Sequence, residues 1–372
     1  MTDTYILYGA PHSLYTGKSR AYLRKQGVRY VERSPSHPAY RDEVLPQIRR
    51  SIIPVLVCPD GTIVQDSVDI LDHFEACGAP VSARPAGPRQ LIAAHVLEIY
   101  GSVGMTRHAM HYRWSYADRQ LHFLKDAFAG RGDPQAAAAV MGRMASYLPA
   151  LGVTPDTIPA IEESYLRLLD ILQAHFAEHP YLFGGQPSLG DYGMLGPLFA
   201  HLGRDPFPEA IMKQRAPKAY RWVERMNAPD ADIPEYRDYR SAYLADDEVP
   251  QTVRALLAHA AEELFPELTD KLDFLSRHLA EHGCRPGDTV AAKPHQRMIG
   301  RVATSFRGVP FESGAAPYTM YLWQRITDDY AAMDAAAQQS VRELLADCGL
   351  SAFLEAERPF RVERRKNIEV WG

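Results

Sequence analysis

Asp66 and Ser67 stand where a helix is predicted to begin, and such a position could bind an anion. The apolar residues that follow have helical spacing, with Val68, Ile70 and Leu71 on one side. The first N–H groups of a helix have no partner inside it, and the helix dipole makes this end positive. An anion could therefore bind here. Ser67 could equally occupy the N-cap position and satisfy these N–H groups itself, and the two interpretations are compatible.

A second group of candidates lies between Tyr100 and Trp114, a segment rich in aromatic, methionine and histidine side chains. They could line an apolar pocket for a small molecule, although their helical spacing is also typical of a buried helix face. His108 and His111 are three positions apart and could share a metal ion, but no cysteine or carboxylate nearby completes a ligand set. We therefore expect no metal site. The segment contributes these candidates: Tyr100, Met105, His108, Met110, His111, Tyr112 and Trp114.

The cysteines suggest neither a disulfide framework nor a zinc ribbon. Only four occur, and no two of them have CxxC spacing. Cys58 lies beside a predicted turn and Cys77 at the end of a predicted helix, so we expect both to be inert, small apolar residues. This cysteine content fits a reducing cytoplasm and disfavours thiol–disulfide exchange by the chain itself.

Charge and hydropathy exclude several classes of partner. The 372 residues include 41 Lys and Arg against 46 Asp and Glu, a net charge of -5, without the basic surplus that nucleic-acid binding requires. No apolar stretch reaches the ~18 residues that would indicate a membrane span, and the first residues do not resemble a secretion signal. We expect a soluble, cytoplasmic protein with no nucleic-acid or membrane partner. The length predicts two or three domains.

About the first 80 residues alternate short apolar runs with helical patterns. Strands are predicted at 5–7, 28–31, 53–57 and 62–64, and a helix over 18–26 between the first two. The turn Pro59-Asp60-Gly61 should join the last two strands into an antiparallel hairpin, since proline presets φ and glycine tolerates the reversal. The predicted order is β-α-β-α-β-β-α, an α+β domain over residues 1–82.

Almost everything after Pro88 has the periodicity of helices, which predicts an all-helical domain over residues 88–228. A composition shift at the prolines before it marks the first boundary. A capping box is expected at Ser188, with Asp191 in place of the usual glutamate, at the start of a core helix.

Asn227 to Asp230 breaks the helical pattern, and residues 231–372 are predicted to form a mostly helical C-terminal extension. Within it, residues 302–308 could form a hairpin or a loop. The segment Tyr318–Tyr330 mixes aromatic with polar residues, so it could close over a bound ligand or be a packed helix with a solvated face. The cations between Arg361 and Lys366 are expected to be solvated.

Several features taken together resemble the glutathione transferase family. The resemblance implies a thioredoxin-like N-terminal domain, a helical second domain, glutathione as co-substrate and a homodimer in which the first domain of one subunit meets the helical domain of the other. Residues after about 228 exceed the usual family length. The features are Leu7-Tyr8 followed by Ser13 and by the run Lys18 to Leu23, then Ile53-Pro54-Val55-Leu56, Gln65-Asp66-Ser67 with Ile70, and Tyr181 to Gly185 with Ser188 to Asp191.

The resemblance assigns the tripeptide to three short segments. In the family the peptide bond before the proline at Pro54 is cis, which turns Ile53 outward so that its N–H and C=O can pair with the cysteinyl unit of glutathione. Pro54 could otherwise simply begin a strand. Ser67 and its helix end would hold the γ-glutamyl carboxylate, while Gln65 or Asp66 faces the ammonium group.

A glutathione enzyme must also lower the pKa of a thiol, which is ~8.5 in a free cysteine. A hydroxyl donor together with a helix N-terminus can do this. Ser13 lies between the first strand and the first helix, where serine-type family members carry their catalytic hydroxyl. It could otherwise only cap that helix. Tyr15 is the second candidate, and Tyr8 looks structural.

We therefore predict a glutathione transferase that activates the glutathione thiol for attack on a small, hydrophobic electrophile, as in detoxification by transfer of alkyl or aryl groups. Two alternatives are a glutathione-dependent lyase, isomerase or ether-cleaving enzyme acting on one metabolite, and a non-catalytic binding or scaffold protein. The cation for the glycyl carboxylate stays open among Arg41, Arg49 and Arg50.

Overall fold

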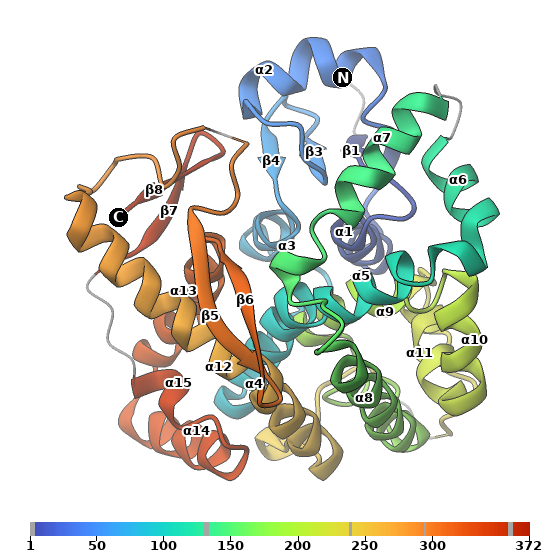
Figure 1. Cartoon of the computed structure of the whole chain (residues 1–372). Helices are drawn as coiled ribbons and strands as arrows, with labels where there is room; N and C mark the ends of the chain where they lie inside the picture. The colour runs from blue at the N-terminus through green and yellow to red at the C-terminus, as the bar shows by residue number, and fades with distance from the viewer. Residues whose placement is uncertain (1–3, 130–133, 238–239, 294, 356–359) are drawn as a thin grey trace.

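A four-stranded mixed sheet forms the first part of the chain in the computed structural model, which describes residues 4–129, 134–237, 240–293, 295–355 and 360–372 (Figure 1). The sheet order is β2-β1-β3-β4; β1 is parallel to β2 and antiparallel to β3, which is antiparallel to β4. Gly61 has a φ of 88° in the β3–β4 turn, as the hairpin prediction requires. The strands are β1 (Tyr5–Tyr8), β2 (Tyr30–Arg33), β3 (Val55–Val57) and β4 (Ile63–Gln65).

Three helices complete this part: α1 (Leu14–Lys25), the short α2 (Leu45–Ile48) after a π-helical turn (Tyr40–Val44), and α3 (Ser67–Ala76). The order β-α-β-α-β-β-α is confirmed. Strand residues alternate between the two faces of the sheet, so that Leu7 joins a core with α1 and α3, whereas Tyr8 joins a second core on the other face. The first helix begins four residues earlier than predicted because Ser13 caps it.

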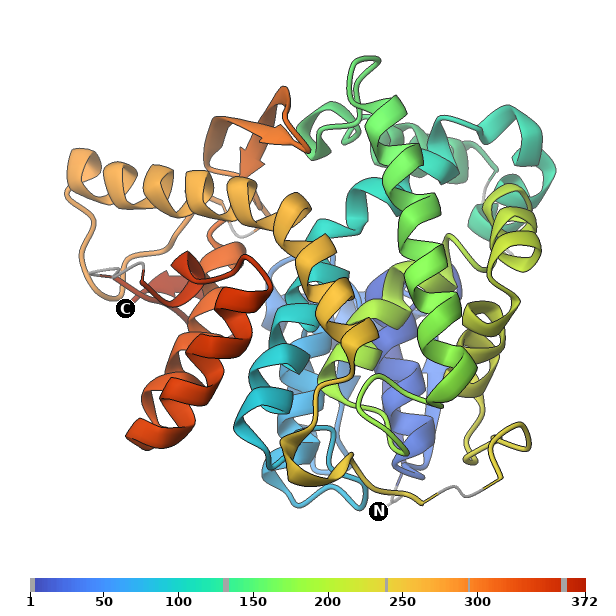
Figure 2. The same cartoon turned by 90° about the horizontal axis from the view of Figure 1, so that it is seen from below.

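The second part is helical, as predicted, and α4 and α9 pack on each other while α9 also covers α1 (Figures 1 and 2). The capping box is confirmed, with Ser188 accepting from the Asp191 N–H and the Asp191 carboxylate accepting from the Ser188 N–H. The helices are α4 (Pro88–Ile99), α5 (Thr106–Trp114), α6 (Leu121–Ala129), α7 (Pro134–Ala145), α8 (Ile158–Glu178), α9 (Leu189–Ala200), α10 (Pro206–Arg215) and α11 (Pro217–Asn227), with short π and 3-10 turns at Tyr100–Gly104, Ala117–Gln120 and Pro149–Leu151.

Among its described residues, the C-terminal extension is mostly helical but holds two β-hairpins. Figure 2 shows the bend of its longest helix, α12, whose interior contains Pro266. The first hairpin confirms one predicted alternative, because Arg307 and Gly308 both have positive φ in a two-residue turn. The elements are a 3-10 turn (Ala245–Asp247), α12 (Gln251–His282), β5 (Gly300–Phe306), β6 (Val309–Ala315), α13 (Tyr318–Ala331), α14 (Ala335–Asp347), α15 (Ala352–Glu355), β7 (Val362–Arg365) and β8 (Ile368–Trp371).

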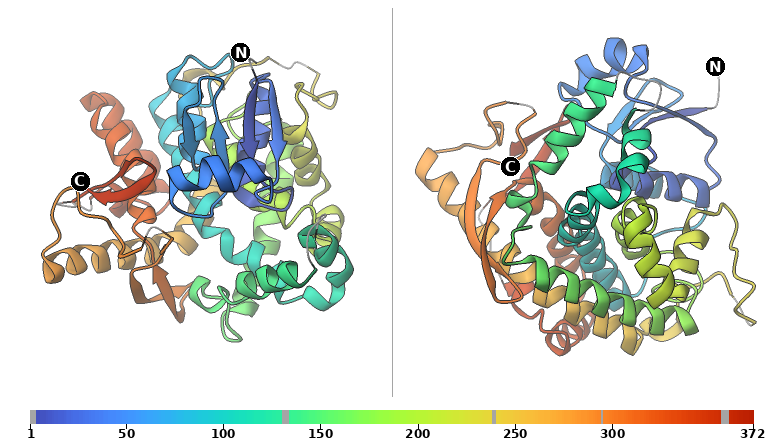
Figure 3. Two further views of the ribbon diagram at one scale, coloured as in Figure 1. Left: turned by 90° about the horizontal axis from the view of Figure 1, so that it is seen from above. Right: turned by 45° about the vertical axis from the view of Figure 1, so that its right-hand side comes forward.

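The second hairpin, β7–β8, was not predicted, and it corrects the expectation for the cations between Arg361 and Lys366. The side chain of Arg364 is only 8% exposed, whereas Arg365 is exposed and pairs with Glu363. Figure 3 shows the hairpin beside the sheet domain when the molecule is viewed from above.

The extension is packed on the rest of the chain rather than tethered to it. Helices α13 and α14 contact α4, and α12 contacts α8. One apolar core contains Val68, Leu195 and Trp371, which come from all three parts. The domain boundaries near 82–88 and 228–231 stay predictions. In the part of the chain that the structure describes, no helix is long and apolar enough to cross a membrane.

Candidate functional site

Three loops that hold the predicted site residues meet at one edge of the sheet. Tyr8 at the end of β1 pairs with Val55 at the start of β3, and Val55 in turn pairs with Gln65 at the end of β4. The chain leaves β1 toward Ser13, enters β3 from Ile53-Pro54 and leaves β4 toward Asp66. The strand register therefore brings together segments that lie more than fifty residues apart in the sequence.

Ser13 is the N-cap of α1. Its hydroxyl oxygen accepts a hydrogen bond from the Thr16 N–H at 3.3 Å, so the capping alternative is correct. A hydroxyl also carries one hydrogen that can be donated, and capping uses only the oxygen. The side chain is half-buried at the positive end of a twelve-residue helix. Capping therefore leaves this hydroxyl chemically available.

The two tyrosines differ from Ser13 in their surroundings. The Tyr15 hydroxyl donates to the Ser102 carbonyl at 3.0 Å, and burial raises the pKa of Tyr15. Tyr8 is 2% exposed and packs on Tyr40 in the core of the sheet, which agrees with its structural interpretation. Tyr15 instead ties α1 to the turn between α4 and α5.

The Ile53–Pro54 peptide bond is cis, as the resemblance implied. Pro54 is buried and leads directly into β3, while Ile53 is half-buried. The Tyr40 hydroxyl donates to the Ile52 carbonyl at 2.7 Å, and the Tyr40 hydroxyl oxygen accepts from the Ile52 N–H at 3.1 Å. This pair of contacts fixes the backbone just before the cis bond.

Asp66, rather than Ser67, is the N-cap of α3, which corrects the predicted capping residue. Its Oδ1 accepts from the Val68 N–H at 2.9 Å, and its φ of 99° places it in a backbone region that L residues rarely adopt. Ser67 is the first helical residue and is buried. The helix end is therefore capped from one position earlier.

Asp66 is also bound by two side chains of the C-terminal extension. The Tyr318 hydroxyl donates to Oδ1 at 2.9 Å, and Arg364 donates to Oδ2 at 3.1 Å. Burial opposes the charge on this carboxyl, but Arg364 and the Val68 N–H hold its pKa below the ordinary value of an aspartate. Asp66 is thus ionised and already paired.

Arg50 is the one of the three candidate arginines that reaches this region. It is 3% exposed and donates to Gln65 Oε1 at 2.6 Å and to Glu369 Oε2 at 2.8 Å. Arg41 pairs at the surface with the neighbouring Asp42, and Arg49 is exposed. Sequence spacing alone could not distinguish the three, because the choice depends on how the loop after α2 folds back.

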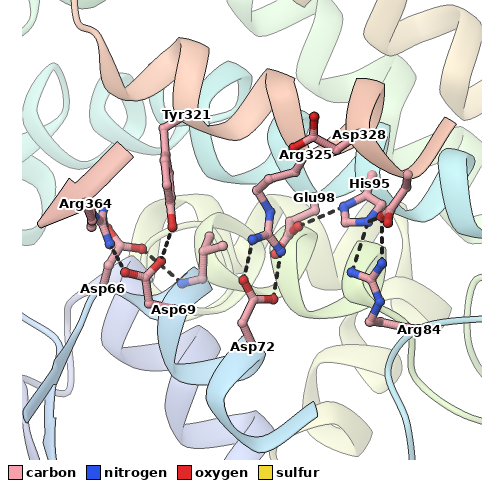
Figure 4. Close-up of polar contacts among 12 residues, drawn as sticks. Asp66, Asp69, Asp72, Arg84, His95, Glu98, Tyr321, Arg325, Asp328 and Arg364 are labelled. Atoms are coloured by element: carbon pink, nitrogen blue, oxygen red, sulfur yellow. Dashed lines mark hydrogen bonds and ion pairs between the residues drawn. The ribbon is translucent and has the colours of Figure 1, made fainter. Parts of the chain in front are cut away.

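Aspartates on the first two turns of α3 also meet side chains of the extension (Figure 4). Asp69 accepts from the Tyr321 hydroxyl at 2.6 Å and pairs with Arg364, and Asp72 pairs with Arg325 at 2.8 Å. These partners were missed from the sequence. The only available signal was the mixture of tyrosine and arginine in Tyr318–Tyr330, and the structure shows this segment to be a packed helix whose polar side faces α3.

The predicted pocket segment between Tyr100 and Trp114 is buried. Its seven candidates are at most 9% exposed, in agreement with the core interpretation. His108 and His111 turn to different partners: His108 Nε2 lies 3.0 Å from Ser164 Oγ, and His111 Nε2 lies 3.0 Å from Glu162 Oε1.

A different apolar surface lies beside the start of α1. The His12 ring packs on Phe128 with a centroid distance of 4.1 Å, and burial together with nearby Arg113 lowers the pKa of His12 to about 4. Phe128 belongs to an apolar cluster on α5, α6 and α7. Its centre is buried and consists of Met110, Trp114 and Leu124, and the partly accessible side chains around it include Phe123, Phe128, Met141 and Met144.

The fold and this sheet edge define a class of protein: a thioredoxin-like domain with a cis-proline loop, joined to a helical domain. Comparison with family models is more specific. Residues 7–79 match the model described as glutathione S-transferase, N-terminal domain, and residues 155–225 match the corresponding C-terminal domain. These two segments of the chain are therefore similar to the two domains of the glutathione transferase family. No curated protein matches it significantly.

Several solved structures are partly similar to this chain, and their names include glutathione S-transferases and a beta-etherase. One is a glutathione S-transferase from Xanthobacter autotrophicus Py2, 22% identical, covering 60% of this chain and 93% of that chain with a TM-score of 0.37. Another, from Methylobacterium radiotolerans JCM 2831, was solved in complex with glutathione sulfonate, at 21% identity, 65% and 100% coverage and a TM-score of 0.39. A beta-etherase from Sphingobium sp. strain SYK-6 is 18% identical, with 61% and 96% coverage and a TM-score of 0.40.

Proposed function

We propose that this protein binds glutathione at the described sheet edge and activates its thiol for attack on a small, hydrophobic electrophile. The observation that supports this most strongly is the Tyr8–Val55–Gln65 register. It brings two helix N-termini and a cis-proline loop to one place. An extended tripeptide needs these groups: an edge backbone for its middle, and positive helix ends for its carboxylate and its thiolate.

In the proposed complex, Ile53 pairs through its backbone with the cysteinyl unit, and Ser67 with the start of α3 holds the γ-glutamyl carboxylate. Gln65 and Asp66 face the ammonium group. Arg50 becomes the proposed cation for a carboxylate of the tripeptide, because it is buried beside Gln65. All of these residues come from the first part of the chain.

Ser13 is the proposed activating residue. Its hydroxyl donates to the thiolate sulfur, and the dipole of α1 adds to this stabilisation. The sulfur would then face the apolar cluster around Phe128, which is suited to the hydrophobic part of an electrophile. Tyr15 is the second candidate, although its hydroxyl already donates to Ser102.

Calorimetric titration with glutathione tests the proposal. We expect saturable binding that Ser67→Ala abolishes and Ser13→Ala retains. In the Ser13→Ala complex, the pKa of the bound thiol should rise toward the ~8.5 of a free cysteine, and Ser13→Thr should restore the lower value. Ser36→Ala, an exposed serine after β2, is the matched control. Absence of binding at millimolar glutathione in wild type and variants would refute the proposal.

Product analysis distinguishes the enzymatic alternatives. Transfer of an alkyl or aryl group leaves glutathione conjugated, as turnover of an aryl halide would show. A lyase, isomerase or ether-cleaving enzyme would instead return glutathione regenerated or oxidised. A non-catalytic binding protein is the candidate favoured by one observation, namely that Asp66 is already paired with Arg364 and Tyr318. Such a protein would bind glutathione without turnover of any electrophile.

The proposal includes a homodimer in the cytoplasm with a role in detoxification, as the family resemblance implies. Light scattering distinguishes the mass of one chain, 41.7 kDa, from twice that value.

A further inference from the structure

The β7–β8 hairpin carries an oppositely charged pair on the face that meets the sheet domain. Arg364 and Glu369 are direct partners across the two strands, and their side chains approach to 3.5 Å. Both side chains are less than 10% exposed, at 8% and 9%. By contrast, the next residue of the same strand, Arg365, has 58% of its side chain exposed.

Arg364 is the cation of this pair, and it is bound by the residues at the end of β4 and the start of α3. It donates to the Gln65 carbonyl at 3.0 Å and to Asp66 Oδ2 at 3.1 Å, and it also pairs with Asp69. The Tyr321 ring lies under the guanidinium, with a distance of 4.7 Å to its centroid. The Asp66 carboxylate, which is proposed to face the ammonium group of glutathione, is therefore already paired with Arg364.

Glu369 is the anion of the pair, and it is bound by Arg50. The guanidinium of Arg50 donates to both carboxylate oxygens, at 2.8 and 3.2 Å. The same guanidinium donates to Gln65 Oε1. Arg50, which is proposed to bind a carboxylate of the tripeptide, is therefore already paired with the carboxylate of Glu369.

We propose that the β7–β8 hairpin is an internal ligand of the glutathione site, in which Arg364 and Glu369 take the places of an ammonium group and a carboxylate of the tripeptide. This inference rests on the proposed function. Glutathione then binds only when the hairpin leaves Asp66 and Arg50.

The chemistry favours competition over simultaneous binding. Both Asp66 oxygens already accept hydrogen bonds, two on Oδ1 and one from Arg364 on Oδ2. A second cation beside Arg364 would be repelled in a region from which water is largely excluded. A tethered group also acts at a high effective concentration because it loses little translational freedom on binding. The hairpin should therefore weaken the apparent affinity for free glutathione.

Calorimetry with glutathione as the probe tests the proposal on the full chain. Arg364→Ala should lower the dissociation constant at least about tenfold relative to wild type, because Asp66 Oδ2 is then released from the hairpin. Glu369→Gln, which keeps the size of the side chain, should also lower it. The matched control is Arg365→Ala on the same strand, which should bind as wild type does. Circular dichroism of each variant verifies the fold.

Hydrogen exchange gives a second measurement that requires no substitution. Saturating glutathione should speed amide exchange in residues 362–371 of the wild type, while the other hairpin of the extension, residues 300–315, stays unchanged. Equal or weaker binding by Arg364→Ala and Glu369→Gln, or slower exchange in β7–β8, would overturn the internal-ligand proposal while leaving glutathione binding intact. If neither the wild type nor any variant binds glutathione, the proposed function fails, and the hairpin proposal fails with it.

Discussion

Lys18 Nζ lies 2.6 Å from Glu98 Oε1, and the two side chains are 1% and 3% exposed. This ion pair joins α1 to α4, and hence the sheet domain to the helical part. Burial opposes the charge on Glu98, but Lys18 and His95 hold the pKa of this carboxyl well below the ordinary value of a glutamate. The Glu98 carboxyl is therefore ionised in a region that has lost its water.

Removing one partner of this pair should destabilise the protein strongly. Lys18→Ala leaves the Glu98 carboxylate buried without its cation, which typically costs about 3–5 kcal/mol. The double variant Lys18→Met with Glu98→Leu should recover most of this loss, since apolar residues of similar size can replace a buried pair. Urea unfolding measures both. Arg167→Ala, which breaks an exposed pair with Glu262, should cost less than about 1 kcal/mol. A similar loss for Lys18→Ala would contradict the expectation.

Two glycines on helical segments should respond to alanine in opposite directions. A Cβ at Gly101 would lie 2.3 Å from the backbone of Gly193 on α9, so Gly101→Ala must push two helical segments apart and should cost more than about 2 kcal/mol. A Cβ at Gly142 on α7 meets nothing within 4 Å. Gly142→Ala should therefore stabilise by about 0.5–1 kcal/mol through helix propensity. Thermal unfolding tests the pair, and a shift in the same direction for both would refute it.

His175 should make the protein sensitive to acid. Its Nε2–H donates to the Tyr181 carbonyl at 3.1 Å, and its Nδ1 accepts from the Thr252 hydroxyl at 2.7 Å. Burial, and His179 beside it, lower the pKa of His175 to about 3. Because the unfolded chain takes up this proton near pH ~6.5, the contribution of His175 to stability is present above that pH. It is lost as the pH falls toward the folded-state value.

Between pH 7 and pH 5 this one residue should account for about 2 kcal/mol of lost stability. His175→Gln removes the titrating group, so the difference in unfolding free energy between the two pH values should shrink by that amount. Urea unfolding at both pH values measures it. The exposed His122 on α6 provides the control, and His122→Gln should leave the difference unchanged. An unchanged difference in His175→Gln would show that this histidine is charged in the folded state.

Phe128 should matter for the proposed electrophile but not for glutathione. Phe128→Ala removes the ring that packs on His12, and should raise KM for an aryl electrophile about tenfold, equivalent to ~1.4 kcal/mol. KM for glutathione should stay the same, because no proposed contact to the tripeptide involves α6. Leu121→Ala is the control on the same helix, since Leu121 is 41% exposed. If both KM values rise together, Phe128 supports the whole site rather than the second substrate.

Local patterns predicted the elements that build the site. The β3–β4 turn, the helix start near Ser67 and the Ser188 capping box depend on neighbours a few residues away, whereas the start of α1 was predicted four residues too late. One error was also local: Asp66 caps α3 because its carboxylate accepts from the Val68 N–H, whereas Ser67 was predicted to be the capping residue.

The occupants of the site could not be predicted in the same way. The hydrogen bond from Tyr318 to Asp66 joins residues separated by 252 positions, and that from Arg364 joins residues separated by 298. A sequence pattern shows that arginines and tyrosines are present in the extension. It does not show which of them face α3, because this depends on the path of α12 and on how α13 packs.

The separation of Asp66 and Arg364 in the sequence also means that Asp66 is synthesised well before Arg364. A ribosome that adds roughly 5–20 residues per second needs about 15–60 s to cover it, and the separation is 298 residues. Throughout that interval the nascent chain carries Asp66 and Asp69 without the Arg364 guanidinium that pairs with them in the folded protein. The acidic end of the sheet domain is therefore uncovered until the C-terminal hairpin has been synthesised, and free cations can reach it during that time.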